Sequence, residues 1–194
     1  MYPLSVESAD PTPASPGLRR PLHVHIPKTA GTSLRRALGL TDPPHLTASQ
    51  LRAHVGEGEW EAGFSFAIVR NPFDRLLSIY SAGRTHNRNR TRERFQRLTF
   101  GEWVREELED GHPRLTARWR YHEWLDLPVD HVWRFENMDE AWTSVQREAG
   151  VSLGDLPVIH KTKHGHYRDV FDESTRRLVE AHYARDLDVY GYEF

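Results

Sequence analysis

The alternation of apolar and polar positions near residue 21 predicts a strand followed by a helix. The segment "LHVHIP", residues 22–27, is a short apolar run. The next segment, "TSLRRALGL", carries apolar residues at helical spacing and ends in the region of Gly39. A strand joined to a helix by a tight turn is the first βα unit of an α/β fold.

A second unit of the same kind follows. The run "FSFAIV", residues 64–69, is apolar throughout, as in a strand that is buried on both faces. It leads into "RNPFDRLLSIYSAG", where Asn71 is a suitable N-cap, Pro72 takes the first helical position and Asp74 falls in the first turn. We therefore expect a helix directly after this strand.

Two capping-box patterns predict further helices. Residues 47–50, "TASQ", predict a helix that starts at Ser49 or just before it, which leaves His45 immediately outside the helix N-terminus. Residues 99–102, "TFGE", predict another helix, closed by Gly111.

The last third of the chain predicts one more strand and two more helices. The segment "DHVWRFEN", residues 130–137, has the pattern of a strand, and Asn137 is placed to cap a helix that runs to about residue 149. Arg134 and Glu136 alternate on this strand, which favours a buried ion pair near the site. Residues 172–187 predict a single last helix.

Composition limits the classes of protein. Residues 1–20 are rich in Pro and Ser and predict a flexible tail, so one domain is expected over residues 21–194. A formal net charge of −2 argues against a general nucleic-acid binder. The absence of cysteine excludes disulfides, a thiolate nucleophile and Cys-ligated zinc. No apolar stretch reaches the roughly 20 residues of a membrane span, and a soluble, cytoplasmic, bacterial protein is expected.

The first strand-to-helix turn, "HIPKTAGTSL", has the chemistry of an anion site. Free backbone N–H groups lie at such a turn, and Gly31 lets the backbone approach an anion closely. Thr32 and Ser33 add hydroxyl donors, and Lys28 adds a full positive charge. Because the lysine precedes the glycine, the spacing differs from that of a P-loop ATPase.

A second cation, Arg70, stands at the end of the second strand, and Ser78 follows on the next helix. Ligands of open α/β sheets bind beyond the carboxyl ends of the strands, so Lys28 and Arg70 can reach one crevice. Two anion-binding turns predict a ligand with two anionic groups.

These segments resemble the sulfotransferases. "HIPKTAGTSL" is similar to their 5′-phosphosulfate loop, and "VRNPFDRLLSIY" is similar to their 3′-phosphate motif. With "HLTASQLR", "RFEN" and the segment from "KTKHGHYRDVF" to the end, the resemblance covers nearly all of residues 21–194. It points to the carbohydrate type that includes heparan uronyl 2-O-sulfotransferase. The resemblance implies a P-loop-like, three-layer α/β fold with a central, mainly parallel sheet flanked by helices.

The resemblance implies transfer of a sulfuryl group from 3′-phosphoadenosine 5′-phosphosulfate to an acceptor hydroxyl of a glycan or a small metabolite, without a metal. The product is adenosine 3′,5′-bisphosphate, and Lys28 would stabilise the charge that develops on this leaving group. The donor-binding residues that it implies are Lys28, Thr29, Ala30, Gly31, Thr32 and Ser33 for the phosphosulfate, Arg70 and Ser78 for the 3′-phosphate, and Lys161 and Thr162 in a last nucleotide loop.

The acceptor must lose a proton, which calls for a base with a pKa near neutral. His45 is the candidate, because the 2-O-sulfotransferases carry their catalytic histidine before a similar helix; the alternative is a solvent-facing loop residue. Glu57 and Glu102 are weaker candidates. His23 and His25 alternate on one strand, and packing, or a site-lining role for His25, is favoured over a metal pair.

The segment "GRTHNRNRTRERFQR", residues 83–97, has three interpretations. It is a solvated, partly disordered loop, a contact surface for an anionic acceptor such as a glycan, or a lid over the donor. The acceptor-binding candidates are Arg84, Arg88 and Arg90, with Arg92 and Arg94 beside them.

Two other functions remain open from the sequence. The first is a nucleotide-dependent kinase of similar fold, although no aspartate in a Walker B position is found. The second is a catalytically silent module that binds anionic glycans. Tyr167 is expected to pack in the core rather than stack on adenine.

Overall fold

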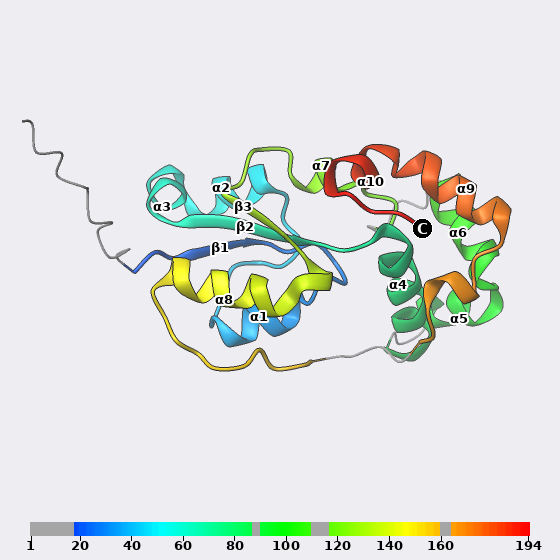
Figure 1. Cartoon of the computed structure of the whole chain (residues 1–194), viewed down its shortest axis with the longest axis horizontal. Helices are drawn as coiled ribbons and strands as arrows, with labels where there is room; N and C mark the ends of the chain where they lie inside the picture. The colour runs from blue at the N-terminus through cyan, green and yellow to red at the C-terminus, as the bar shows by residue number, and fades with distance from the viewer. Residues whose placement is uncertain (1–17, 87–89, 110–116, 160–163) are drawn as a thin grey trace, which may run out of the picture.

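A parallel three-stranded sheet forms the centre of the chain (Figure 1). The computed structural model describes residues 18–86, 90–109, 117–159 and 164–194. The strands are β1 (Pro21–Val24), β2 (Phe64–Val69) and β3 (His131–Arg134), in the order β1-β2-β3. Pro21 pairs with Phe64, and Phe66 pairs with His131. The predicted α/β fold is confirmed; the predicted tail lies almost wholly outside the described residues.

Helices cover both faces of this sheet (Figure 1). Side chains alternate along β2, so Phe66 and Ile68 pack on one helical layer while Ala67 and Val69 pack on the other. The first layer contains α1 (Gly31–Ala37) and α8 (Met138–Ala149). The second contains α2 (Ala48–Val55), α3 (Glu57–Ala62) and α7 (Tyr121–Trp124). All six residues of β2 are buried, as its apolar run predicts.

A group of helices lies beyond the carboxyl end of β2 (Figure 1). These helices are α4 (Pro72–His86), α5 (Arg90–Arg97), α6 (Phe100–Leu108), α9 (Glu173–His182) and α10 (Ala184–Tyr190). Two short 3-10 turns, η1 (Phe135–Asn137) and η2 (Tyr167–Asp169), complete the secondary structure of the described ranges. Phe73, Trp103 and Tyr183 are fully buried in the core of this group. None of the helices in the described ranges is both long and apolar enough to span a membrane.

Three of the predicted helix caps are confirmed, whereas Asn137 precedes α8 without a side-chain capping hydrogen bond. The Thr47 hydroxyl accepts the Gln50 N–H at 3.3 Å, and the Gln50 side chain accepts the Thr47 N–H at 3.0 Å. Thr99 and Glu102 form the same reciprocal pair at the start of α6. The Asn71 side chain accepts the Phe73 N–H at 3.1 Å, which places it as the N-cap of α4.

Two sequence predictions are wrong. The single last helix is interrupted at Tyr183, whose φ of −103° and ψ of 17° end α9. This break lets the buried Tyr183 ring reach the Ala117 carbonyl with its hydroxyl. Arg134 and Glu136 do not form a buried pair, because their side chains are 43% and 34% exposed and 3.9 Å apart. Helix α6 ends at Leu108, and its predicted closing glycine lies outside the described residues.

The packing of α4 against α5 provides a test of the fold. A Cβ at Gly83 would lie 2.4 Å from the buried ring of Phe95, so Gly83→Ala should lower the free energy of unfolding by about 1–3 kcal/mol. Gly101→Ala is the matched control, since its Cβ would meet Thr175 at an ordinary 3.4 Å. The control should be neutral or stabilising by up to ~1 kcal/mol in chemical denaturation. Equal effects of the two substitutions would contradict this packing.

Candidate functional site

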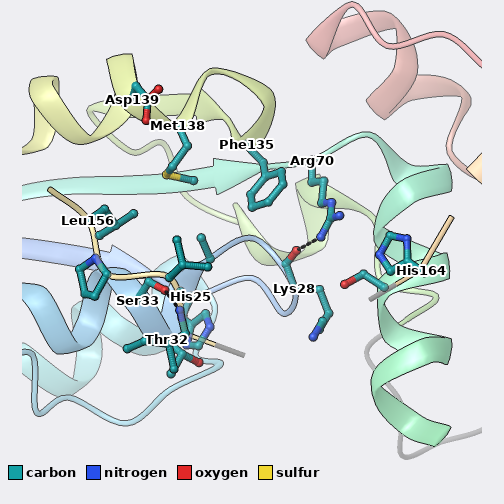
Figure 2. Close-up of a pocket in the computed structure, with 16 residues that line it drawn as sticks. His25, Lys28, Thr32, Ser33, Arg70, Phe135, Met138, Asp139, Leu156 and His164 are labelled. Carbon is teal, nitrogen blue, oxygen red and sulfur yellow. Dashed lines mark hydrogen bonds between the residues drawn. The ribbon is translucent and has the colours of Figure 1, made fainter. Parts of the chain in front are cut away.

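A cavity of about 520 Å³ opens at the carboxyl ends of β1 and β2 (Figure 2). Its polar part is lined by His25, Lys28, Ala30, Gly31, Thr32, Ser33, Arg70 and Ser78. Its other wall is lined by Phe135, Met138, Asp139, Leu156, Pro157, Val158, Ile159 and His164. The cavity therefore brings together the two turns that carry the predicted anion-binding residues.

The turn between β1 and α1 has an unusual backbone. Lys28 and Ala30 have φ angles of 70° and 64°, in the left-handed region that non-glycine residues seldom adopt. The Thr29 hydroxyl donates to the Ile26 carbonyl at 2.8 Å, so Thr29 braces the turn and does not line the cavity. Such turns present successive N–H groups to a shared concave surface, as in known anion sites.

Lys28 is a half-buried cation that faces the cavity. Within the described ranges, its ammonium group has no hydrogen bond or ion pair. Burial, and secondarily the positive charge of Arg70, lower its pKa below the ordinary 10.5. An anion bound between Lys28 and Arg70 would offset both the loss of water around the ammonium group and the repulsion between the two cations.

Arg70 is held in place by contacts on three sides. Its Nε donates to Asp74 at 2.8 Å, and its Nη1 donates to the Lys28 carbonyl at 3.0 Å (Figure 2). Its Nη2 is 2.6 Å from the same Asp74 oxygen, and its guanidinium stacks 4.2 Å above the centre of the Phe135 ring. These contacts use three of the five N–H donors of a guanidinium, which leaves two for a ligand.

Buried polar groups hold the turn after β2. The Tyr121 hydroxyl donates to the Arg70 carbonyl and accepts the Arg70 N–H at 3.2 Å. The Asn71 N–H donates to Glu136 at 2.7 Å, and the Asn71 side chain donates to the Glu193 carbonyl at 2.8 Å. Residues far apart in the sequence therefore fix the backbone that carries Arg70.

His45 lies beside the cavity without lining it. Its ring centre is 4.3 Å from that of His25, and its Nδ1 is 3.1 Å from the His25 carbonyl oxygen. Because a carbonyl only accepts hydrogen bonds, Nδ1 carries the proton and Nε2 keeps a free lone pair. His45 as a whole is an exposed loop residue, as the alternative interpretation expects, but desolvation of its ring beside His25 lowers its pKa below 6.5 and favours the neutral imidazole at pH 7.

The weaker base candidates are placed elsewhere. Glu102 caps α6 by accepting the N–H and the hydroxyl of Thr99, which lowers the pKa of its carboxyl. Glu57 is paired with Arg52, and its pKa is lowered by that contact. Neither lines the cavity, and each carboxylate is held by a partner away from it, whereas the ring of His45 lies 4.3 Å from that of the cavity-lining His25.

A comparison with models of protein families identifies the family of this chain. The model of the sulfotransferase family matches residues 21–193. The chain belongs to the sulfotransferase family. A search of curated proteins and a search of solved structures return no significant match. The family match supports sulfuryl transfer in general, and the heparan uronyl 2-O-type assignment stays a prediction.

The arginine-rich segment of this sulfotransferase is largely helical. Arg84, at the end of α4, donates to the Tyr80 hydroxyl at 2.8 Å. Arg94 pairs with Glu106 at 2.8 Å and with the fully buried Glu107 at 2.5 Å, so it is committed to the fold rather than to an acceptor. The solvated-loop interpretation is thus wrong for the described part of the segment. Arg88, the side chains of Arg90 and Arg92, and the predicted nucleotide-loop residues Lys161 and Thr162 lie outside what the structure describes.

Sequence reasoning missed the apolar wall of the sulfotransferase cavity. Phe135 and Met138 follow β3, and residues 156–159 belong to the segment that follows α8. The Ile159 N–H donates to the Ser33 hydroxyl at 3.2 Å and holds this segment against α1. Apolar residues in a loop give no chemical signal in a sequence. Tyr167, in contrast, packs 5.9 Å from the Phe73 ring, as predicted.

The anchoring of Arg70 can be tested with Tyr121→Phe. The substitution leaves the buried N–H and carbonyl of Arg70 without their partner and should lower the free energy of unfolding by about 1–3 kcal/mol. Tyr190→Phe is the matched control, since the Tyr190 ring contacts Tyr121 at 5.5 Å but its hydroxyl has no hydrogen bond to a described residue. Chemical denaturation measures both, and a Tyr121→Phe protein as stable as the control would refute the anchor.

Proposed function

We propose that this sulfotransferase moves a sulfuryl group from 3′-phosphoadenosine 5′-phosphosulfate to an acceptor hydroxyl by in-line displacement. The observation that carries the proposal is the position of Lys28 and Arg70. They leave neighbouring parallel strands at the same edge, line one cavity and are joined through the Lys28 carbonyl at 3.0 Å. A donor with one anionic group at the 3′ position and one at the 5′ position of its ribose can place one group at each of the two cationic turns.

The cavity also fits such a donor in size and character. Its volume of about 520 Å³ falls in the usual range of small-molecule sites, roughly 300–1,000 Å³. Beside the cationic turns the cavity has an apolar wall formed by Phe135, Met138 and Leu156, and the Phe135 ring stacks on the Arg70 guanidinium. A P-loop-like arrangement of the sheet is part of the same proposal, and it is supported by the three parallel strands with helices on both faces.

Each proposed catalytic residue has one role. Lys28 stabilises the negative charge that grows on the leaving oxygen, while the N–H groups of the turn up to Ser33 hold the phosphosulfate. Arg70 and Ser78 hold the 3′-phosphate. His45 accepts the acceptor's proton at Nε2, the nitrogen that its contact with His25 leaves unprotonated. The donor supplies the activated sulfuryl group. For an anionic acceptor, such as a glycan, we assign Arg84 as a contact.

The two alternatives make different predictions about nucleotides. A kinase would bind ATP with Mg²⁺, and a silent glycan-binding module would not need Lys28. Family membership supports sulfuryl transfer over both the kinase and the silent glycan-binding module.

Calorimetric titration with adenosine 3′,5′-bisphosphate, AMP and ATP tests the donor site. The bisphosphate should bind about 10- to 100-fold more tightly than AMP, because Arg70 adds charge-assisted hydrogen bonds to the 3′-phosphate. Arg70→Lys should remove most of that preference. Arg134→Ala, an exposed arginine at the end of β3 that does not line the cavity, should leave it unchanged. Equal or tighter binding of ATP would refute the proposal.

The pH dependence of turnover tests His45. Only neutral His45 is a base, and its lowered pKa keeps it neutral at pH 7, so activity should be lost as the pH falls through a value below 6.5. His45→Ala should reduce the release of adenosine 3′,5′-bisphosphate by about 10²- to 10⁴-fold and should flatten this acid limb. Nucleotide affinity should be unchanged.

His54→Ala is the control for this experiment, since His54 is an exposed histidine of α2 paired with Asp42 at 3.8 Å. An acid limb that persists in His45→Ala would place the base elsewhere.

A further inference from the structure

His25 is a buried polar side chain of the cavity to which the proposed mechanism gives no role. It is only 7% exposed, it follows β1 directly, and it lines the cavity three residues before Lys28. Its Nδ1 is buried and has no hydrogen-bond partner among the described residues. A buried polar ring of this kind is costly unless a ligand or another contact compensates for it.

The ring of His25 lies across the start of α1. A Cβ at Gly31 would lie 1.9 Å from Cδ2 and 2.0 Å from Nε2 of His25. The Nε2 edge therefore sits on the Gly31 backbone, which itself lines the cavity. Figure 2 shows His25 on the same side of the cavity as Thr32 and Ser33. The His25 ring leaves no room for a side chain at position 31. This contact is a more direct reason for the glycine than the geometry of the turn.

The surroundings of His25 keep it neutral. Burial, with smaller contributions from His23, His45 and Arg35, lowers the pKa of His25 to about 2. A neutral imidazole has one N–H, and a buried N–H without an acceptor is rarer in proteins than an unpaired acceptor. The proton therefore belongs on Nε2, at the cavity edge, and the lone pair belongs on the enclosed Nδ1.

We propose that the Nε2–H of His25 donates a hydrogen bond to a 5′-phosphate oxygen of the phosphosulfate group held beside Lys28. The inference rests on the proposed function and assigns a further residue to it. A neutral donor contacts the anion without burying a third cation beside Lys28 and Arg70. Its contribution is also constant over the pH range in which His45 titrates.

His23, two residues before His25, is an example of a purely structural histidine. It stacks 5.4 Å from His25 and 4.7 Å from Phe66, and both of its ring nitrogens are buried without a partner in the described ranges. It shares the burial and the stacking of His25 but does not line the cavity. His23 is therefore the matched control for His25.

The test compares two nucleotides that differ only at the 5′ position. Calorimetry is carried out with adenosine 3′,5′-bisphosphate and with adenosine 3′-monophosphate. His25→Met, which removes the donor, should weaken binding of the bisphosphate by about 10-fold or more and change binding of the monophosphate by less than about twofold. His25→Gln has a similar length and keeps an N–H, so it should retain most of the affinity. His23→Met should change neither.

The outcomes separate the inference from the function on which it rests. Equal weakening of both nucleotides by His25→Met, or no weakening of either, overturns the role of His25 while the donor site stands. A wild-type protein that binds neither nucleotide overturns the donor site and His25 with it. The imidazole ¹⁵N shifts of the wild-type protein provide a measurement without variants. They should report a protonated Nε2 that responds to the bisphosphate but not to the monophosphate, and a protonated Nδ1 would refute the proposal.

Discussion

The hydrogen bond from Arg70 to the Lys28 carbonyl is the contact on which the candidate site depends. Parallel strands in register end at the same edge of a sheet, so β1 and β2 deliver their following turns side by side. The bond then joins the turn of one cation to the side chain of the other. A displacement of either turn would move both cations.

Polar contacts over long sequence distances keep this edge rigid. Glu136, just after β3, accepts the Asn71 N–H at 2.7 Å and the Tyr192 hydroxyl at 2.8 Å. Tyr121 satisfies both backbone groups of Arg70 from a different layer. The Tyr121 hydrogen bonds are buried and therefore costly to break, because each group left unpaired has lost its water. Glu136 and Tyr192 thus support the β2 turn without lining the cavity.

The charge of the site is local and is not visible in the overall composition. The chain as a whole has a formal net charge of −2, yet Lys28 and Arg70 face one cavity, where burial and then the charge of Arg70 lower the pKa of Lys28. Asp74 pairs with Arg70 on one side only, so the turn keeps positive charge toward the cavity. His25 and His45 lie near these two cations, and as neutral imidazoles they supply polar groups without adding a positive charge.

The sequence alone determined the strands, three of the helix caps and the placement of Lys28 and Arg70 in one crevice. Caps such as Thr47 and Thr99 depend on residues three positions apart, and the strand β2 depends on a continuous apolar run, so both can be read locally. Only the tertiary structure decided the apolar wall, the break at Tyr183 and the pairing of Arg94 with the buried Glu107. It also decided that His25 rather than His45 lines the cavity, because that choice depends on how Gly31 and two neighbouring rings pack around one imidazole.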